Sequence, residues 1–336
     1  MNLDQIVVYS SPVKFKEAMA AAPRTLWVGA LSFEDRCMGS LSRLSESNLS
    51  MTEGIALNYS TEAYPLSLDR EQRNRNWTAL QSYNDLIFET NVRQINIASY
   101  SFKELQSFVE KNIVEKEIDF VIFDITCLSK LHTLALAAEL SQVSFKWVVA
   151  YTLPENYGNL EKSKKISMGW RDIIIAPLAE TAHLFNESHS RGIILPGHET
   201  DRLIVALAEL EPAGGVIVVT ETPKRPDLRS LCESNNKNVI RQLKSMRSHS
   251  WLSHIVSLND LRLLRSHIDK EIASVKRFDS PIILFPFGPK SFVFFAGLQL
   301  CSQYPDASWF VYPIPLNYDV NYSEGIENTS WFMAGE

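Results

Sequence analysis

The sequence is poor in the residues that build metal, disulfide and dinucleotide motifs. Its 4 cysteines are far apart without a CxxC pair, and its 7 histidines lack the spacing that places two ligands on one helix face. With only 13 glycines it contains no GxGxxG motif, and complete P-loop and GxSxG motifs are also missing. We therefore expect no structural metal and no organic cofactor.

The chain also lacks a basic excess and long apolar runs. Its 33 basic and 39 acidic residues give a formal net charge of −6, which argues against a protein that binds duplex DNA through a broad basic face. No stretch approaches the roughly 18 consecutive apolar residues of a membrane span, and the first residues do not resemble a secretory leader. These features predict a cytoplasmic protein that does not bind membranes.

Apolar runs rich in β-branched residues alternate with segments of helical periodicity, which is typical of a mostly parallel sheet covered by helices. In the first half we predict strands at Gln5–Tyr9, Thr25–Ala30, Gly54–Tyr59, Gln94–Ser99, Phe120–Ile125 and Lys146–Tyr151. Between them we predict helices at Pro12–Ala21, Glu34–Leu44, Arg70–Tyr83, Phe102–Ile113 and Lys130–Leu140.

The second half repeats this order of elements. QIVVYSSPVKF, from Gln5, aligns with DIIIAPLAETA, from Asp172, and the later landmarks keep their order, with Lys130 opposite Lys290 and Trp147 opposite Trp309. An S-x-G follows the last aligned segment of each half. We therefore predict an α/β protein of two tandem Rossmann-like, doubly wound, mostly parallel sheets related by internal duplication, with repeats at residues 1–168 and 169–336.

Polar residues follow the strands at the edge where ligands of open parallel sheets bind. A hydroxyl and a lysine at the start of a helix add a hydrogen-bond donor and a positive charge, which favour the binding of an anion. The guanidinium of a nearby arginine can bind the same anion through two hydrogen bonds. The alternative is that the hydroxyls cap helices and that Glu34 or Glu199 pairs with its own arginine. The candidate ligand-binding residues are Ser32, Glu34, Arg36, Thr126, Ser129, Lys130, Arg202, Gly288, Lys290 and Ser291.

Three groups at the same edge are candidate catalytic residues. Asp124 ends a predicted strand, where it could act as a general base, and His198 beside Glu199 could form an acid–base pair. Neither has an equivalent in the other repeat, and a solvated loop histidine is the commoner case. Matched asparagines, Asn74 and Asn76 in one repeat and Asn236 and Asn238 in the other, predict amide hydrogen bonds to a ligand, between the repeats or at a helix start.

The segment FDITCLSKL, from Phe123 to Leu131, runs into the apolar helix LALAAEL and resembles the strand–turn–helix of the CRISPR-associated Rossmann fold (CARF) family. In that family this turn helps to bind a cyclic oligonucleotide. The resemblance implies that Thr126, Ser129 and Lys130 contact a ligand and that Lys290 and Ser291 are their partners in the second repeat. Cys127 and Leu128 stand where the family has paired glycines, so the match is incomplete.

The leading hypothesis is a sensor or adaptor that binds a phosphate-bearing nucleotide or cyclic oligonucleotide in a pseudo-symmetric pocket between the repeats, in bacterial antiviral defence. An effector subunit would be its protein partner. One alternative is a nucleoside or nucleotide hydrolase or transferase that uses Asp124, His198 or Glu199. The other is a scaffold subunit that grips a partner protein through the aromatic anchors Tyr318, Tyr322 and Trp331.

Overall fold

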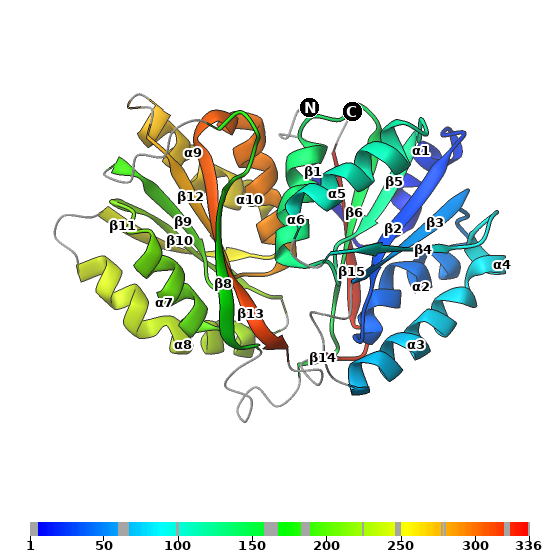
Figure 1. Ribbon diagram of the computed structural model, residues 1–336, viewed down its shortest axis with the longest axis horizontal. Coiled ribbons are helices and arrows are strands. Elements are labelled where there is room, and N and C mark those ends of the chain that lie inside the picture. The colour runs from blue at the N-terminus through cyan, green and yellow to red at the C-terminus, as the bar shows by residue number, and fades with distance from the viewer. Residues whose placement is uncertain are drawn as a thin grey trace. The chain divides into compact units, whose positions relative to one another are not determined.

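The computed structural model shows two units, each built on one main sheet (Figure 1). It describes residues 6–59, 67–98, 101–157, 167–182, 189–223, 225–245, 250–276, 278, 280–318 and 323–334. Contacts between Cα atoms assign Met1–His132, Val143–Ser163 and Asp319–Glu336 to unit 1, and Thr133–Gln142 and Lys164–Tyr318 to unit 2. The predicted α/β class with two largely parallel sheets is confirmed.

Unit 1 contains a seven-stranded sheet in the order β1-β15-β6-β5-β2-β3-β4. Its strands are β1 (Ile6–Tyr9), β2 (Thr25–Leu31), β3 (Glu53–Tyr59), β4 (Arg93–Ile97), β5 (Phe120–Asp124), β6 (Lys146–Leu153) and β15 (Asn328–Ala334). Its helices are α1 (Lys16–Ala20), α2 (Gly39–Glu46), α3 (Ser67–Gln81), α4 (Asn84–Ile87), α5 (Phe102–Val109) and the start of α6 (Lys130–Leu140). Short 3-10 turns at Pro12–Phe15 and Asp35–Met38 precede α1 and α2, and a π-turn at Glu110–Val114 follows α5.

Unit 2 contains a six-stranded sheet in the order β11-β10-β9-β12-β13-β8. Its strands are β8 (Ser167–Pro177), β9 (Arg191–Leu195), β10 (Gly214–Glu221), β11 (Ser250–Ser257), β12 (Ile282–Pro286) and β13 (Ser308–Tyr318). Its helices are α7 (Thr200–Glu209), α8 (Pro226–Ser245), α9 (Leu261–Lys276) and α10 (Lys290–Gln303), with a 3-10 turn at Pro305–Ala307. Two short strands, β7 (Asn156–Tyr157) and β14 (Ser323–Glu324), pair in unit 1.

The central strands form because their apolar side chains are covered on both faces. Every residue of β2 and β5 is buried, as is every residue of β12, and helices lie on both sides of each sheet (Figure 1). In unit 2 the face below α7 and α8 is filled by Ile194, Ile217 and Phe285 together with side chains of both helices. The same strands end at one edge of each sheet, which places the following turns together.

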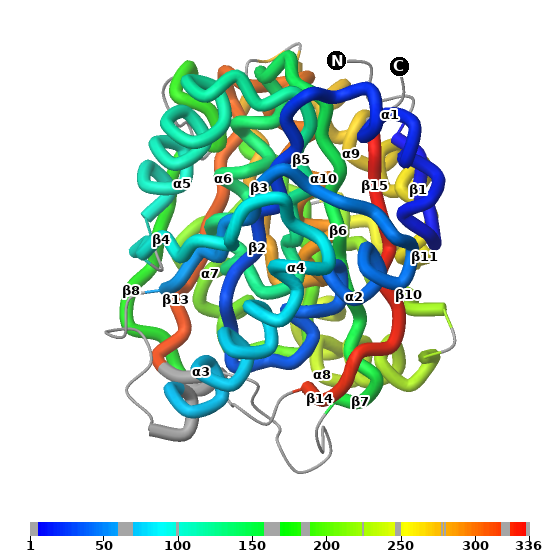
Figure 2. The backbone as a smooth tube through the Cα atoms, turned by 90° about the vertical axis from the view of Figure 1, so that its right-hand side faces the viewer, coloured from blue at the N-terminus to red at the C-terminus, as the bar shows by residue number. Residues whose placement is uncertain are grey.

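The chain crosses between the two sheets after each set of parallel strands. After β6 it continues into β8, which pairs antiparallel with β13 in the second sheet. After β13 it continues into β15, which pairs antiparallel with β6 in the first sheet. Figure 2 shows β15, in red, running between β6 and β1. Each sheet is therefore completed by a strand that follows the parallel strands of the other.

The sequence did not predict β15, and it aligned β1 with the second half of β8, from Asp172 onward. The structure gives these two strands different places, because β1 covers the outer edge of β15 whereas β8 pairs directly with β13. The structural counterpart of β8 is β15, and an S-x-G begins or precedes both strands, at Ser167 and Ser323. The repeat boundary at residue 168 stays a prediction, but the contacts place the segment after Tyr318 in unit 1.

Trp331 of β15 is fully buried, and its ring lies 5.3 Å from that of Phe15 between ring centroids. The interpretation of this tryptophan as an exposed aromatic anchor is therefore wrong. Of the other two proposed anchors, Tyr322 and the side chain of Tyr318 lie outside the described residues. Within the described chain, no helix combines the length and the apolar character needed to cross a membrane.

Replacing Trp331 by alanine tests whether β15 is an integral strand of the first sheet. Removing this buried ring should lower the free energy of unfolding by about 3–5 kcal/mol, measured by urea denaturation. Trp170 on the counterpart strand β8 is 45% exposed, so Trp170→Ala is the matched control and should cost less than about 1 kcal/mol. Equal losses in the two variants would contradict this placement of β15.

Candidate functional site at the carboxyl ends of the strands

Asp124 and Thr126 shape the turn that follows β5. Both side chains are buried, and Asp124 accepts hydrogen bonds from the Ser40 hydroxyl and from the backbone N–H of Thr126, the latter at 2.9 Å. The Thr126 hydroxyl accepts from the N–H of Thr152 at 2.9 Å, which ties the turn to β6. The structure thus gives both residues protein partners that hold the turn in place.

A chain of hydrogen bonds continues from this turn into α6. The N–H of Ser129 donates to the Tyr59 hydroxyl at 2.9 Å, and the Ser129 hydroxyl caps α6 by accepting from the N–H of His132 at 3.1 Å. His132 Nδ1 lies 3.0 Å from the Tyr59 hydroxyl and Nε2 lies 3.1 Å from the carbonyl of Ser101. Because a carbonyl only accepts, Nε2 carries the proton and Nδ1 accepts from Tyr59.

His132 is held neutral by this arrangement. Its side chain is fully buried, and burial lowers the pKa of its imidazole from the ordinary 6.5 to about 4. The ring also stacks on Tyr59 with 5.3 Å between centroids. Sequence reasoning missed His132, because it lies inside an apolar helix where no polar pattern marks it.

In unit 1, Arg36 and Glu34 form a buried ion pair after β2. Arg36 Nε lies 2.7 Å from Glu34 Oε2, and Arg36 is 4% exposed. Glu34 also accepts from the hydroxyl of Ser323, which the sequence analysis identified only as part of an S-x-G repeat and not as a site residue. The Ser32 hydroxyl accepts from the N–H of Glu34 at 3.2 Å and helps to shape the same loop.

Unit 2 contains an equivalent buried ion pair between Arg202 and Glu199. Arg202 Nη1 lies 2.7 Å from Glu199 Oε2, and its Nε donates to the carbonyl of Pro313 on β13 at 2.9 Å. The guanidinium also lies over the Tyr312 ring, 4.8 Å from its centroid. The alternative that each glutamate pairs with its own arginine is therefore confirmed, whereas ligand contact by these arginines stays a prediction.

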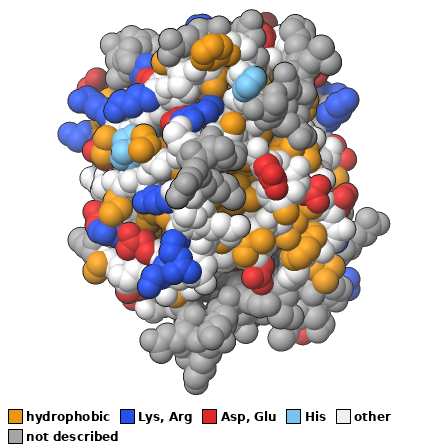
Figure 3. All heavy atoms as spheres, turned by 90° about the vertical axis from the view of Figure 1, so that its left-hand side faces the viewer, with side chains coloured by type: hydrophobic (Ala, Val, Ile, Leu, Met, Phe, Trp, Pro, Cys, Tyr) orange, Lys and Arg blue, Asp and Glu red, His pale blue; other side chains and the backbone are white. Residues whose placement is uncertain are grey.

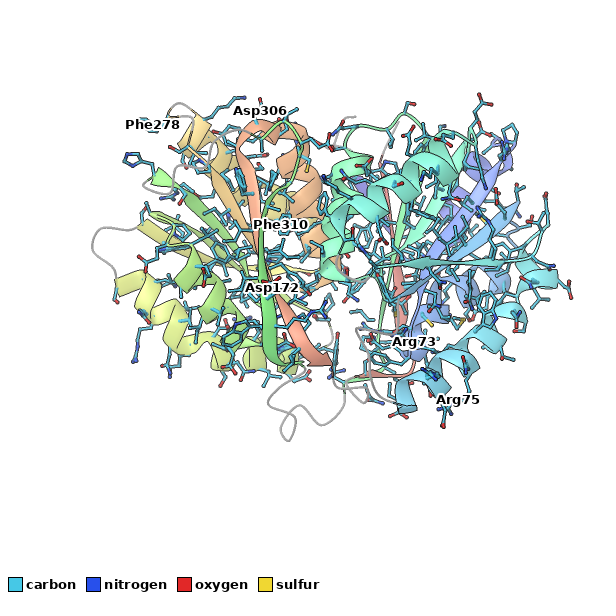
Figure 4. All side chains as sticks on the ribbon, in the orientation of Figure 1. Arg73, Arg75, Asp172, Phe278, Asp306 and Phe310 are labelled. Carbon is cyan, nitrogen blue, oxygen red and sulfur yellow. The ribbon has the colours of Figure 1, made fainter. Side chains whose placement is uncertain are left out.

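Two of the matched asparagines hold these loops from the neighbouring helices. Asn76 of α3 donates to the carbonyl of Ser32, and Asn236 of α8 donates to the carbonyl of Gly197, both at 2.8 Å. On the same helix α3, Arg73 donates to the carbonyl of Tyr59 at 3.2 Å, whereas Arg75 lies exposed (Figure 4). Of the four asparagines predicted as ligand, interface or capping groups, Asn76 and Asn236 thus anchor loops within their own units.

Gly288 lies in the turn between β12 and α10, and Lys290 and Ser291 are the first two residues of α10. Loops meet closely here, since a Cβ on Gly197 would lie 2.2 Å from the carbonyl oxygen of Phe287. No side chain caps α10 at its N-terminus, in contrast to α6. The fully buried Ser291 hydroxyl and the Asn236 amide oxygen have no hydrogen-bond partner among the described residues. The described residues therefore leave these two buried hydrogen-bonding groups unsatisfied.

The candidate catalytic residues are distributed over both units, Asp124 in unit 1 and His198 with Glu199 in unit 2. Glu199 forms an ion pair with Arg202, and Asp124 accepts a hydrogen bond from the backbone of its own turn. Their catalytic roles, and the pocket shared by the repeats, stay predictions. Within the described residues, no three His, Cys, Asp or Glu side chains are grouped so that they could hold a metal ion.

Comparison with known proteins gives similarity at the level of the fold. No protein family matches the sequence, and no curated protein matches it either. Among solved structures, a type III CRISPR defence DNA nuclease activated by cyclic oligoadenylate is similar over 90% of this chain and 68% of its own, with a TM-score of 0.51 and 9% identity. The CARF-like turn is therefore accompanied by a likeness in fold over most of the chain.

Two other structures are more distant. Can2 from Sulfobacillus thermosulfidooxidans, in complex with cyclic tetra-adenylate, matches 38% of this chain at 14% identity and a TM-score of 0.28. The match spans about a third, 32%, of the length of Can2. UDP-GlcNAc 2-epimerase from Methanocaldococcus jannaschii matches over 90% of this chain and 96% of its own, with 11% identity and a TM-score of 0.25.

The buried imidazole of His132 makes stability depend on pH in a defined window. Unfolded His132 gains a proton near pH 6.5 and folded His132 only near pH 4, so stability is complete above 6.5 and falls as the pH drops between these values. The loss should level off at about 3 kcal/mol, because each pKa unit corresponds to about 1.36 kcal/mol.

Urea denaturation of the wild type and of His132→Gln, repeated from pH 7 to pH 4, measures this contribution. The variant is less stable at pH 7, and the difference should shrink by about 3 kcal/mol toward pH 4. His189→Gln is the control, since His189 is exposed and should leave the profile unchanged. A His132→Gln profile that runs parallel to that of the wild type would contradict the buried, neutral state.

Proposed function

We propose that this protein binds a phosphate-bearing nucleotide of the cyclic oligoadenylate class and acts as a sensor or adaptor in antiviral defence. The likeness in fold to a nuclease activated by cyclic oligoadenylate, over 90% of this chain, supports the ligand class. The CARF-like turn at Thr126–Lys130 supports it independently from the sequence. A protein partner that carries the effector activity follows from the same hypothesis.

The observation that carries the proposal is the start of α10. A helix of 14 residues that lacks a side-chain cap presents its first N–H groups and a positive partial charge, which favour a phosphate. Lys290 adds a cation at the first position of the helix, and the buried Ser291 hydroxyl adds a donor without a partner in the described chain. Gly288 lets the backbone of this turn pack against Leu195.

The corresponding turn of unit 1 would make a weaker contribution. Ser129 already caps α6, and the Thr126 hydroxyl accepts from Thr152, so both side chains are engaged within the protein. We infer that the second repeat supplies the stronger phosphate contacts and that Lys130 adds mainly charge. Two repeats that contribute unequally in this way would bind the two sides of a ligand differently.

Isothermal titration with cyclic oligoadenylates of different ring sizes, and with AMP as the linear control, tests the proposal. Lys290→Ala should weaken binding by about tenfold or more, because hydrogen bonds to charged groups contribute about 1.5–3 kcal/mol. Ser291→Ala should weaken it by about fivefold, yet leave the free protein equally or more stable, since it removes a buried hydroxyl without a partner.

Ser302→Ala is the matched control. Ser302 also has a buried hydroxyl without a partner among the described residues, but it lies near the other end of α10. This variant should bind as the wild type does. Failure of every cyclic oligoadenylate to bind would refute the ligand class, whereas binding that survives Lys290→Ala and Ser291→Ala unchanged would refute the site.

A further inference from the structure

The outer edge of β8 is the place where the two sheets differ most. In the first sheet the equivalent strand β15 is covered by β1, which pairs with it from Trp331 to Ala334. In the second sheet β8 is the edge strand among the described residues, and it pairs with β13 on its inner side. The edge of the first sheet therefore accepts an antiparallel strand, whereas no described strand pairs with the matching edge of the second sheet.

The backbone of β8 points hydrogen-bonding groups toward this outer edge. Ile173 lies opposite Pro313, which has no N–H, and the Pro313 carbonyl accepts instead from Arg202. The N–H of Ile173 donates to the carboxylate of Asp172 at 2.8 Å. Ile173 and Pro313 therefore form a non-hydrogen-bonded pair of the antiparallel ladder. In such a pair each residue directs its N–H and C=O groups away from the partner strand, so those of Ile173 point to the outer edge. By alternation, Ile175 also presents its N–H and C=O at the outer edge.

The side chains beside this edge are apolar and exposed. Ile175 is 41% exposed and shares a face of the sheet with the half-buried Ile173. Trp170 is 45% exposed, and Asp172 stands on the same strand (Figure 4). Ile173 already packs against the core of unit 2, so a paired strand would mainly cover Ile175. The Asp172 carboxylate opposes such pairing, because it accepts the hydrogen bond of the Ile173 N–H.

We propose that β8 pairs antiparallel with β8 of a second copy of this chain. The second sheet of one copy would then continue, edge to edge, into the second sheet of the other. A two-fold axis perpendicular to the sheet at Ile174 places Ile173 opposite Ile175 of the other copy, so that the outward N–H and C=O groups bond each other. Asp172 then faces Ala176 and Arg171 faces Pro177, so no like charges oppose each other. The edge is thus self-complementary, as a closed symmetric dimer requires.

The other outer strand of this sheet, β11, fits such a pair less well. Leu252 and Ile255 are 57% and 42% exposed, but they lie on opposite faces of the strand because their positions differ by an odd number. Figure 3 looks onto the side of unit 2 that carries β11, where apolar and charged side chains are intermixed. This strand therefore provides a control surface in the same sheet.

Sedimentation velocity over a concentration series tests the β8 pair with two variants, one expected to strengthen the dimer and one expected to weaken it. Asp172→Ala frees the N–H of Ile173 and should lower the dimer dissociation constant by about tenfold. Ile175→Pro removes an outward N–H without removing a bond to β13, and should shift the protein to the monomer. Leu252→Lys on β11 should leave the equilibrium unchanged.

Two outcomes would overturn the proposal. One is a monomer at every concentration for both the wild type and Asp172→Ala, which would leave the edge to a different protein or to none. The other is dissociation of a dimer by Leu252→Lys but not by Ile175→Pro, which would move the contact to β11. Circular dichroism of Ile175→Pro verifies that loss of the dimer is not loss of the fold.

Discussion

The outer edges of β6 and β13 each need an antiparallel strand, and the chain supplies both by crossing between its sheets. β8 follows the parallel strands of the first sheet and pairs in the second, while β15 follows those of the second and pairs in the first. Burial of Trp331 against Phe15 makes this pairing part of the hydrophobic core of unit 1. The covalent connections thus make the fold of each unit depend on a segment joined to the other.

A second constraint is repeated at the carboxyl ends of both sheets. A buried arginine binds a glutamate of its own loop, Arg36 with Glu34 and Arg202 with Glu199, while an asparagine of the neighbouring helix holds a loop carbonyl. Breaking such a pair is costly, because it leaves an uncompensated charge in the interior. These contacts keep the loops fixed beside the starts of the helices that follow them.

The parallel strands were predictable because their apolar runs are local and long, as in β2 and β5, whose predicted bounds differ from the observed bounds by a residue. The strand β15 was not, because NTSWFMA begins with three polar residues, which leaves only a short apolar run, and its partner β6 is distant in the sequence. At the site, the pairing of Glu34 with Arg36 follows from their spacing. The bond between His132 and Tyr59 depends on tertiary packing, which no local pattern reports.

The crossing of the chain also sets an order of events during synthesis. All the strands of the second sheet, from β8 to β13, are made before β15, so this sheet can be completed while the first still lacks the strand that covers β6. Domains generally fold in the order in which they leave the ribosome. Here the unit that is begun first is completed last, and until then β6 and β1 both lack the strand that lies between them.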